Sequence, residues 1–167
     1  MVDKLERIAL DALDLALLNR LQDDASESNQ ALAKRVHISP PTCLRRVKRL
    51  KDAGLIERQI ALLDPDLLAQ HMGHGLTAIV EITLDRQGAD WLDAFEQRVL
   101  PDDAVQQCYR VSPGPDFVLV VHARDMPQYH ALAQRLFTSD ANVRNVKAFF
   151  SVKRAKFGAQ LPLGKAT

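Results

Sequence analysis

Apolar residues recur at helical spacing in three short segments of the first 56 residues. This period of about 3.6 residues predicts three amphipathic helices. Ser28 is placed to cap the second helix, and residues 37–39 leave room only for a tight turn before the third. The apolar positions that define the first two helices are Leu13, Leu17, Leu18 and Leu21, followed by Leu32 and Val36.

The third segment opens with two prolines and ends before a glycine. Ser39 can cap a helix whose first position is Pro40, where the missing N–H costs nothing. Pro41 is tolerated within the same first turn. Gly54 fits the left-handed residue that often follows a helix. The prolines are therefore interpreted as a start signal, and the glycine as the stop.

The pattern changes after this helix. Residues 55–63 alternate in part around Ile56 and Ile60, which predicts a strand leading out of a first domain that spans residues 1–63. Residues 64–74 contain Pro65 and Gly73 and are typical of a linker with one helical turn.

From residue 75 onward, strand and helix patterns follow in the order β-α-β-β-α-β, which is that of a ferredoxin-like domain. The predicted fold class is α+β, with an N-terminal winged-type helix-turn-helix domain and a ferredoxin-like domain over residues 75–167 that ends in a basic tail. Strands are predicted over residues 76–84, 104–111, 117–123 and 143–152, and helices over 89–100 and 127–137.

Both faces of the predicted sheet carry apolar residues. Ile79 points away from the side shared by Ala78 and Val80, and Phe149 points away from the side of Phe150. We expect helices to cover one face and a partner chain to cover the other, at least partly. On the last strand, the residues expected to face one way are Val146, Ala148, Phe150 and Val152.

The formal net charge of +1 hides a strong local asymmetry. Residues 34–58 contain eight basic and two acidic residues, whereas residues 1–33 contain three basic and seven acidic ones. A basic block of this kind suits a polyanion better than a small acidic molecule. A second, weaker basic region follows Asp140, where no acidic residue remains.

The basic block lies on one side of the predicted third helix. A surface helix usually mixes charges of both signs, so this segregation favours a DNA-reading helix over an ordinary surface helix. At about 100° per residue, the apolar side carries Cys43, Val47 and Leu50, and the opposite side and its flanks carry Thr42, Arg45, Arg46, Lys48 and Arg49.

No residue pattern indicates catalysis, a cofactor or a metal. His71 and His74 are three apart, but they flank Gly73 in the predicted linker and no carboxylate joins them at ligand spacing. Cys43 and Cys108 stand in no CxxC array and are expected to be reduced thiols of a cytoplasmic protein. No glycine-rich phosphate loop, nucleophile elbow or membrane-length apolar run occurs.

The stretch ALAKRVHISPPTCLRRVKRLKDAGLIERQIALLDP resembles the helix-turn-helix and exit strand of the Lrp/AsnC, or feast/famine, family of transcriptional regulators. VEITL, DMPQYHALAQRLF and LPL also have counterparts in that family, so the resemblance covers nearly the whole chain. It implies a DNA-binding regulator without enzyme activity. It further implies that the second domain forms homodimers and octamers and, in many members, binds an amino acid.

The expected partner is therefore double-stranded operator DNA. One such domain is too small to specify a site, so a dimer on a pseudo-palindromic operator is expected. Arg45 and Arg49 can present bidentate forks to guanine, whereas Arg46, Lys48 and Lys34 are better placed for phosphates. The complete set of expected DNA contacts is Lys34, Ser39, Pro41, Thr42, Arg45, Arg46, Lys48 and Arg49.

The expected effector site departs from the family pattern. The family's turn between the second and third strands reads like GDYD or GDFD, and its backbone N–H groups help hold an amino acid. Two prolines remove such donors here, which leaves either a rigid hairpin turn or a site that favours apolar amino acids. The matching residues are Ser112, Pro113, Gly114, Pro115 and Asp116.

One alternative belongs to another functional class. Siroheme decarboxylase subunits resemble the same two-domain architecture. That interpretation requires catalytic histidines in the second domain, for which His122 and His130 are the candidates. The cationic third helix counts against it, because such an enzyme has little need of a DNA-reading surface.

Overall fold

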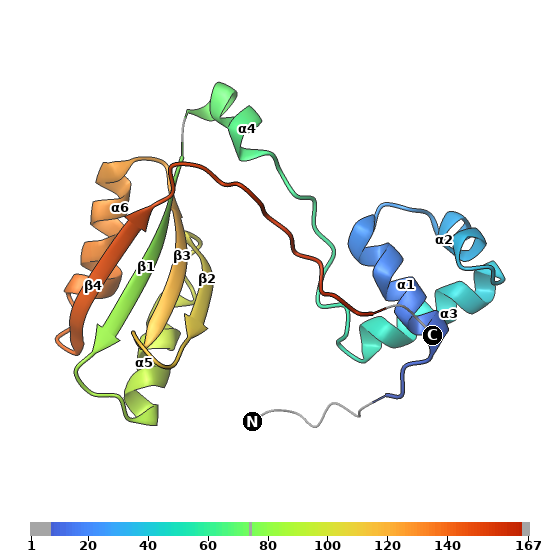
Figure 1. Cartoon of the computed structure of the whole chain (residues 1–167), viewed down its shortest axis with the longest axis horizontal. Coiled ribbons are helices and arrows are strands. Elements are labelled where there is room, and N and C mark those ends of the chain that lie inside the picture. Colours follow the sequence, from blue (N-terminus) through green and yellow to red (C-terminus); the bar gives the residue numbers. More distant parts are fainter. Residues whose placement is uncertain (1–7, 74, 165–167) are drawn as a thin grey trace. The chain divides into compact units, whose positions relative to one another are not determined.

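The structure, a computed structural model, describes residues 8–73 and 75–164. These residues form two units, which Figure 1 draws with the chain coloured from end to end. The first unit contains residues 8–62 and 156–164, and the second contains the remaining described residues between 63 and 155.

The first unit confirms the three predicted helices: α1 (Ala12–Asp23), α2 (Asn29–Arg35) and α3 (Pro40–Asp52). The side chain of Ser28 caps α2, accepting a hydrogen bond of 3.2 Å from the backbone N–H of Ala31. The helices enclose a small apolar core whose buried members are Leu17, Leu32, Ala33, Cys43 and Leu50.

The helices α2 and α3 end in the same way. His37 follows α2 with a φ of 56°, and Gly54 follows α3 with a φ of 72°. In each case the next N–H reaches back to the last turn: Ile38 to the carbonyl of Ala33 at 3.0 Å, and Leu55 to that of Leu50 at 3.1 Å. This is the Schellman arrangement. It confirms the tight turn at residues 37–39 and the role of Gly54.

The predicted strand over residues 55–63 is wrong for this chain. No strand occurs between residues 55 and 73 of the described structure. Apolar alternation indicates which side chains could share a face, but a strand also needs a neighbour for its backbone hydrogen bonds. The linker is also more helical than predicted, because α4 (Pro65–Met72) has eight residues. Asp64 caps it, accepting a bond of 3.1 Å from the N–H of Leu67.

The C-terminal tail packs with the first unit, whereas the sequence analysis assigned it to the second domain. The Gln22 side chain on α1 makes two hydrogen bonds with the backbone of Leu161. Its Nε2 donates to the carbonyl at 2.8 Å, and its Oε1 accepts from the N–H at 2.9 Å. One amide thus satisfies both polar groups of a tail residue, a pairing that no periodicity predicts.

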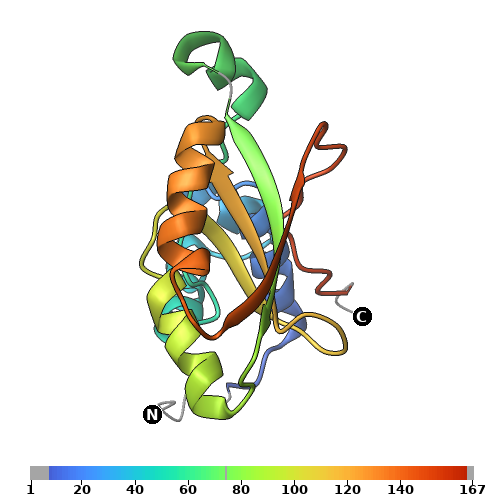
Figure 2. The ribbon, with the colours of Figure 1, turned by 90° about the vertical axis from the view of Figure 1, so that its left-hand side faces the viewer.

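The second unit confirms the predicted βαββαβ order. Its strands are β1 (Leu76–Leu84), β2 (Val105–Arg110), β3 (Phe117–Ala123) and β4 (Val143–Phe150), all antiparallel to their neighbours in the order β2-β3-β1-β4. The helices α5 (Ala89–Val99) and α6 (Met126–Ala133) cover one face of this sheet (Figure 2). A short π-helix, Gln134–Thr138, continues α6.

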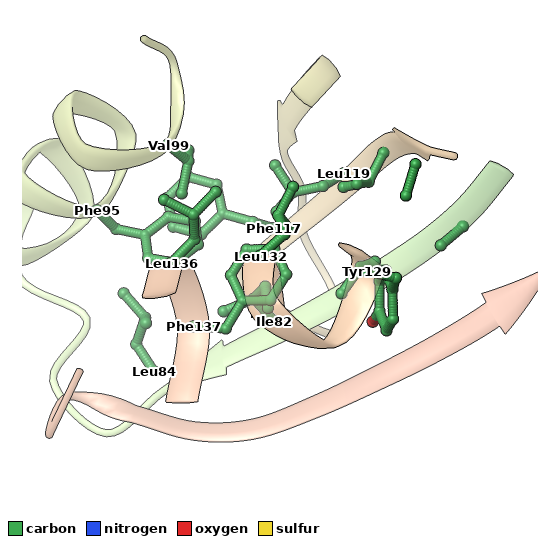
Figure 3. Packing of buried hydrophobic residues seen from close by; sticks show 14 residues of the cluster. Ile82, Leu84, Phe95, Val99, Phe117, Leu119, Tyr129, Leu132, Leu136 and Phe137 are labelled. Atoms are coloured by element: carbon green, nitrogen blue, oxygen red, sulfur yellow. The ribbon is translucent and has the colours of Figure 1, made fainter. Parts of the chain in front are cut away.

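The core of the second unit lies between these helices and the sheet (Figure 3). The rings of Phe95 on α5 and Phe117 on β3 are stacked, with centroids 4.6 Å apart. Aromatic pairs in this geometry add to the stabilisation from burial. Phe95 and Val99 on α5, Tyr129 and Leu132 on α6, and Leu136 on the π-helix are all buried.

The other face of the sheet carries exposed apolar side chains. Ile79 is 44% exposed, and its neighbour across β4, Phe149, is 52% exposed. Tyr109 on β2 is 53% exposed on the same face, which we call the open sheet face. The predicted orientation of Val152 is wrong, because β4 ends at Phe150 and Val152 is fully exposed.

Candidate nucleic-acid interface

The start of α3 is held by polar contacts. Ser39 occupies the cap position, as predicted, but its hydroxyl lies 2.8 Å from that of Thr42 and makes no bond to a backbone N–H. The Asn29 side chain donates to the carbonyl of Pro40 at 2.8 Å, which ties the beginning of α2 to that of α3. These contacts fix the side of the turn that leads into α3.

The two sides of α3 are as different as its sequence predicts. Cys43 and Leu50 are buried in the core of the first unit. Arg45 and Lys48 are exposed, as is Lys34 on α2. No ion pair joins these three cations to any other described residue. Their charges are thus available to an anionic partner.

Asp14 is the only buried charged side chain among the described residues. Its Oδ1 accepts from Nη1 of Arg46 at 2.8 Å, and its Oδ2 forms an ion pair with Nη2 of Arg49. Nη1 of Arg46 also lies 2.8 Å from Oδ2 of Asp11. Two of the four α3 arginine and lysine residues predicted to meet DNA are therefore tied to α1.

The same carboxylate is fixed at the beginning of its own helix. The backbone N–H of Asp11 donates to Oδ2 of Asp14 at 3.1 Å, and the N–H of Asp14 donates to Oδ1 of Asp11 at 2.8 Å. This reciprocal capping box satisfies two N–H groups at the helix start, where the helix dipole also favours negative charge. Asp14 is a rigid anchor for the two arginines.

A shallow hollow of about 220 Å³ lies beside this network, lined by Asp11, Arg45, Arg46 and Arg49. The structure thus brings together three of the arginines predicted to bind DNA. Three guanidinium groups against the two carboxylates of Asp11 and Asp14 leave a local excess of one positive charge, the kind of surface that attracts phosphate.

The hydrogen bond from the backbone N–H of Asp14, and then that from Arg46, hold the pKa of Asp11 below its ordinary value of 3.8. A depressed carboxyl pKa contributes stability that is present above the ordinary value and is lost as the pH falls through the folded-state value. We therefore expect Asp11→Asn to flatten the fall in the free energy of unfolding between about pH 5 and pH 2. Urea denaturation across this range measures the free energy of unfolding. The control is Asp52→Asn, because Asp52 is an exposed carboxylate outside the network.

The loop at residues 112–116 joins β2 to β3. Gly114 has a φ of 126°, a conformation that favours glycine. Asp116 holds the loop to β1: its N–H donates to the carbonyl of Ile82 at 2.8 Å, and its Oδ2 accepts from the N–H of Leu84 at 2.6 Å. Asp116 therefore supports the loop, and the flanking residues Ser112 and Gly114 are exposed.

The two histidines of the enzyme alternative lie on different elements. His122 lies within β3, one residue before its end, with its Nδ1 3.2 Å from the hydroxyl of Thr77, whereas His130 is on α6 with its ring 6.1 Å from that of Tyr129. In residues 8–73 and 75–164, no three His, Cys, Asp or Glu side chains could together hold a metal. His74 lies outside the described residues. No helix in the described part of the chain is long and apolar enough to cross a membrane.

Two family models match the chain. Residues 10–57 match a winged helix-turn-helix DNA-binding model, and residues 77–161 match the Lrp/AsnC ligand binding domain. A leucine-responsive regulatory protein of Rhizobium meliloti is 34% identical over 157 residues, which cover 94% of this chain and 98% of the relative. The chain belongs to the Lrp/AsnC family of transcriptional regulators.

Solved structures of Lrp/AsnC regulators agree with this assignment. The crystal structure of an AsnC family regulator from Agrobacterium tumefaciens has a TM-score of 0.81 and 31% identity, and covers 92% of this chain and 97% of that chain. A Neisseria meningitidis regulator solved as an L-Met complex also has a TM-score of 0.81, with 30% identity and coverage of 93% and 97%. Fold, family and regulatory function thus match the sequence analysis.

Asp11 and Asp14 were not among the site residues predicted from the sequence. The spacing of two aspartates three apart, directly before an apolar helix, is a capping-box signal and could have been recognised. Their pairing with arginines more than 30 residues later depends on how α1 packs against α3. Helical periodicity carries no such information.

Proposed function

We propose that this Lrp/AsnC regulator binds operator DNA by placing α3 in the major groove. The observation that carries the proposal is the division of α3 into a buried apolar side and an exposed cationic side, next to a fixed turn from α2. In a helix-turn-helix, the second helix reads base edges while the first crosses the backbone. The matches to DNA-binding relatives support this use of the surface.

The proposed DNA contacts include three cationic side chains that have no ion pair among the described residues. Arg45 is exposed and unpaired among the described residues, so its fork can adapt to a guanine edge. Lys34 and Lys48 are exposed cations suited to phosphates. The remaining proposed contacts are Ser39, Pro41, Thr42, Arg46 and Arg49.

Selection of DNA fragments from a random pool by the full chain, followed by mobility-shift titration, tests this function. Enrichment of a common sequence, bound more tightly than scrambled DNA of equal length, is the expected result. Equal affinity for selected and scrambled fragments would contradict it. Titration with a porphyrin in parallel tests the siroheme decarboxylase alternative, for which no binding is expected.

We further propose a homodimer formed through the open sheet face, with octamers built from dimers, in the cytoplasm. Ile79, Tyr109 and Phe149 leave apolar surface in water on this face. Contiguous exposed apolar patches commonly mark contacts with another protein. A dimer would present two α3 helices to two half-sites, which predicts a pseudo-palindromic operator.

An amino acid is the proposed effector, because the family model describes a ligand binding domain and a relative was solved with L-Met. Pro113 and Pro115 have no N–H to donate, so burial of an apolar side chain must supply more of the affinity. We expect leucine or methionine to raise the melting temperature or shift the oligomer distribution, and asparagine to do neither. Calorimetric titration against all amino acids decides it: tight asparagine binding would contradict the selectivity, and no binding would favour a rigid turn.

A further inference from the structure

We propose that Asp14 is a positioning residue for DNA recognition. Its buried carboxylate fixes the guanidinium groups of Arg46 and Arg49, so that both contact backbone phosphates and set the register in which Arg45 reads bases. This inference rests on the proposed function, in which α3 enters the major groove.

The contacts of the Asp14 side chain hold it in one position. The side chain is fully buried, and its two oxygens accept from Arg46, from Arg49 and from the backbone N–H of Asp11. A buried carboxylate that loses its partners is costly, so the arginines are held where these bonds can form. The capping box removes the remaining freedom, because it fixes the carboxylate to the first turn of α1.

Arg46 and Arg49 are each paired with Asp14 at one edge of the guanidinium group, and both side chains are still partly exposed. The Arg49 side chain is 44% exposed although its Nη2 is paired with Asp14, and the Arg46 side chain is 24% exposed. A guanidinium has five N–H donors, so a carboxylate at one edge leaves donors for an anion at another. The hollow lined by Asp11, Arg45, Arg46 and Arg49 is where these donors converge.

Arg45 differs from the other two arginines. Arg46 and Arg49 are turned toward α1 by their ion pairs, whereas Arg45 is exposed without one in the described structure. Phosphate contacts orient a protein on the duplex without reading sequence, and base contacts then specify. The structure thereby favours phosphates for Arg49, which the sequence analysis assigned to base reading.

Positioning and simple charge predict opposite effects for Asp14→Asn. The change removes one negative charge beside three arginines, so charge alone would tighten binding to every DNA sequence. Loss of positioning would instead let both guanidinium groups find phosphates in several registers. We expect affinity for random DNA to hold or rise while affinity for the selected site falls, which lowers the specificity ratio on the order of tenfold, the size of one lost specific contact.

The experiment measures anisotropy of labelled duplexes with the full chain: a fragment selected by the natural protein, and a scrambled fragment of equal length. Asp52→Asn is the control, because it removes one negative charge from α3 at an exposed carboxylate that lies outside the network of Asp11, Asp14, Arg46 and Arg49. Its specificity ratio is expected to stay within about twofold of the natural protein. A cycle with Arg49→Ala adds a second readout, since that change should matter less once Asp14 is gone.

The outcomes separate the possible failures. If the natural protein selects no DNA, the proposed function itself is wrong. If it does, and Asp14→Asn keeps the natural specificity ratio, Asp14 has no positioning role. If Asp14→Asn does not fold, Arg49→Lys decides, because lysine keeps the charge but cannot form the planar fork. That variant must lower the ratio while holding random-DNA affinity, and an unchanged ratio overturns the inference.

Discussion

Replacement of Arg45 by alanine is expected to weaken binding of the selected operator by about 1–3 kcal/mol, or roughly 5- to 150-fold. Arg45 is exposed on the cationic side of α3 and has no ion pair in the described structure. Its loss therefore leaves the fold intact and removes a direct contact with a base edge. Affinity for scrambled DNA should change much less, and the preference for one base in each half-site should relax.

The control for Arg45→Ala is Lys48→Ala, three residues later on the same exposed helix surface. As a phosphate contact, Lys48 should contribute equally to all sequences, so its removal should lower both affinities together. It should also reduce the slope of log affinity against log salt by about one. Anisotropy titrations at several salt concentrations measure both effects. Equal losses on specific and scrambled DNA for Arg45→Ala would show that it, too, contacts only phosphates.

The helices and their ends could be predicted because their causes are local. Pro40 and Gly54 determine where α3 begins and ends through backbone chemistry alone. The order of elements in the second unit followed from period-2 and period-3.6 patterns in the same way. On β1, Ala78 and Val80 are both buried and were predicted to share a side, because alternation along a strand fixes which side chains share a face.

The features that could not be predicted depend on partners distant in sequence. Residues 55–63 alternate like a strand, yet no neighbouring strand pairs with them among the described residues. The tail packs beside α1 because one glutamine amide matches the backbone of Leu161. The role of Asp14 likewise appears only when α1 is packed against α3. In the candidate interface, the sequence therefore predicts which cations gather, but not which are free to move.

The open sheet face carries a row of apolar side chains. Ile79 on β1 lies opposite Phe149 on β4 and Val120 on β3, so its side chain is at the centre of an apolar row. The helices α5 and α6 occupy the opposite face and cannot cover this row (Figure 2). In a second copy of the chain, the same face would offer an identical apolar row, as a two-fold symmetric dimer requires.

Ile79→Asp is therefore expected to convert the proposed dimer into a monomer at micromolar concentration. A carboxylate at the centre of the row would be buried without a partner, at a cost of several kcal/mol, larger than most interfaces can absorb at one position. Trp91→Asp is the matched control: Trp91 is 43% exposed against 44% for Ile79, but it lies on α5, on the other side of the sheet. Light scattering should report an assembled natural protein, an assembled Trp91→Asp variant and a monomeric Ile79→Asp variant, with melting curves showing that both variants fold.

The monomer should also lose the tight binding that two linked half-site contacts provide, while keeping weak binding to one half-site. A natural protein that is already monomeric, or an Ile79→Asp variant that stays assembled, would show that this face is not the interface.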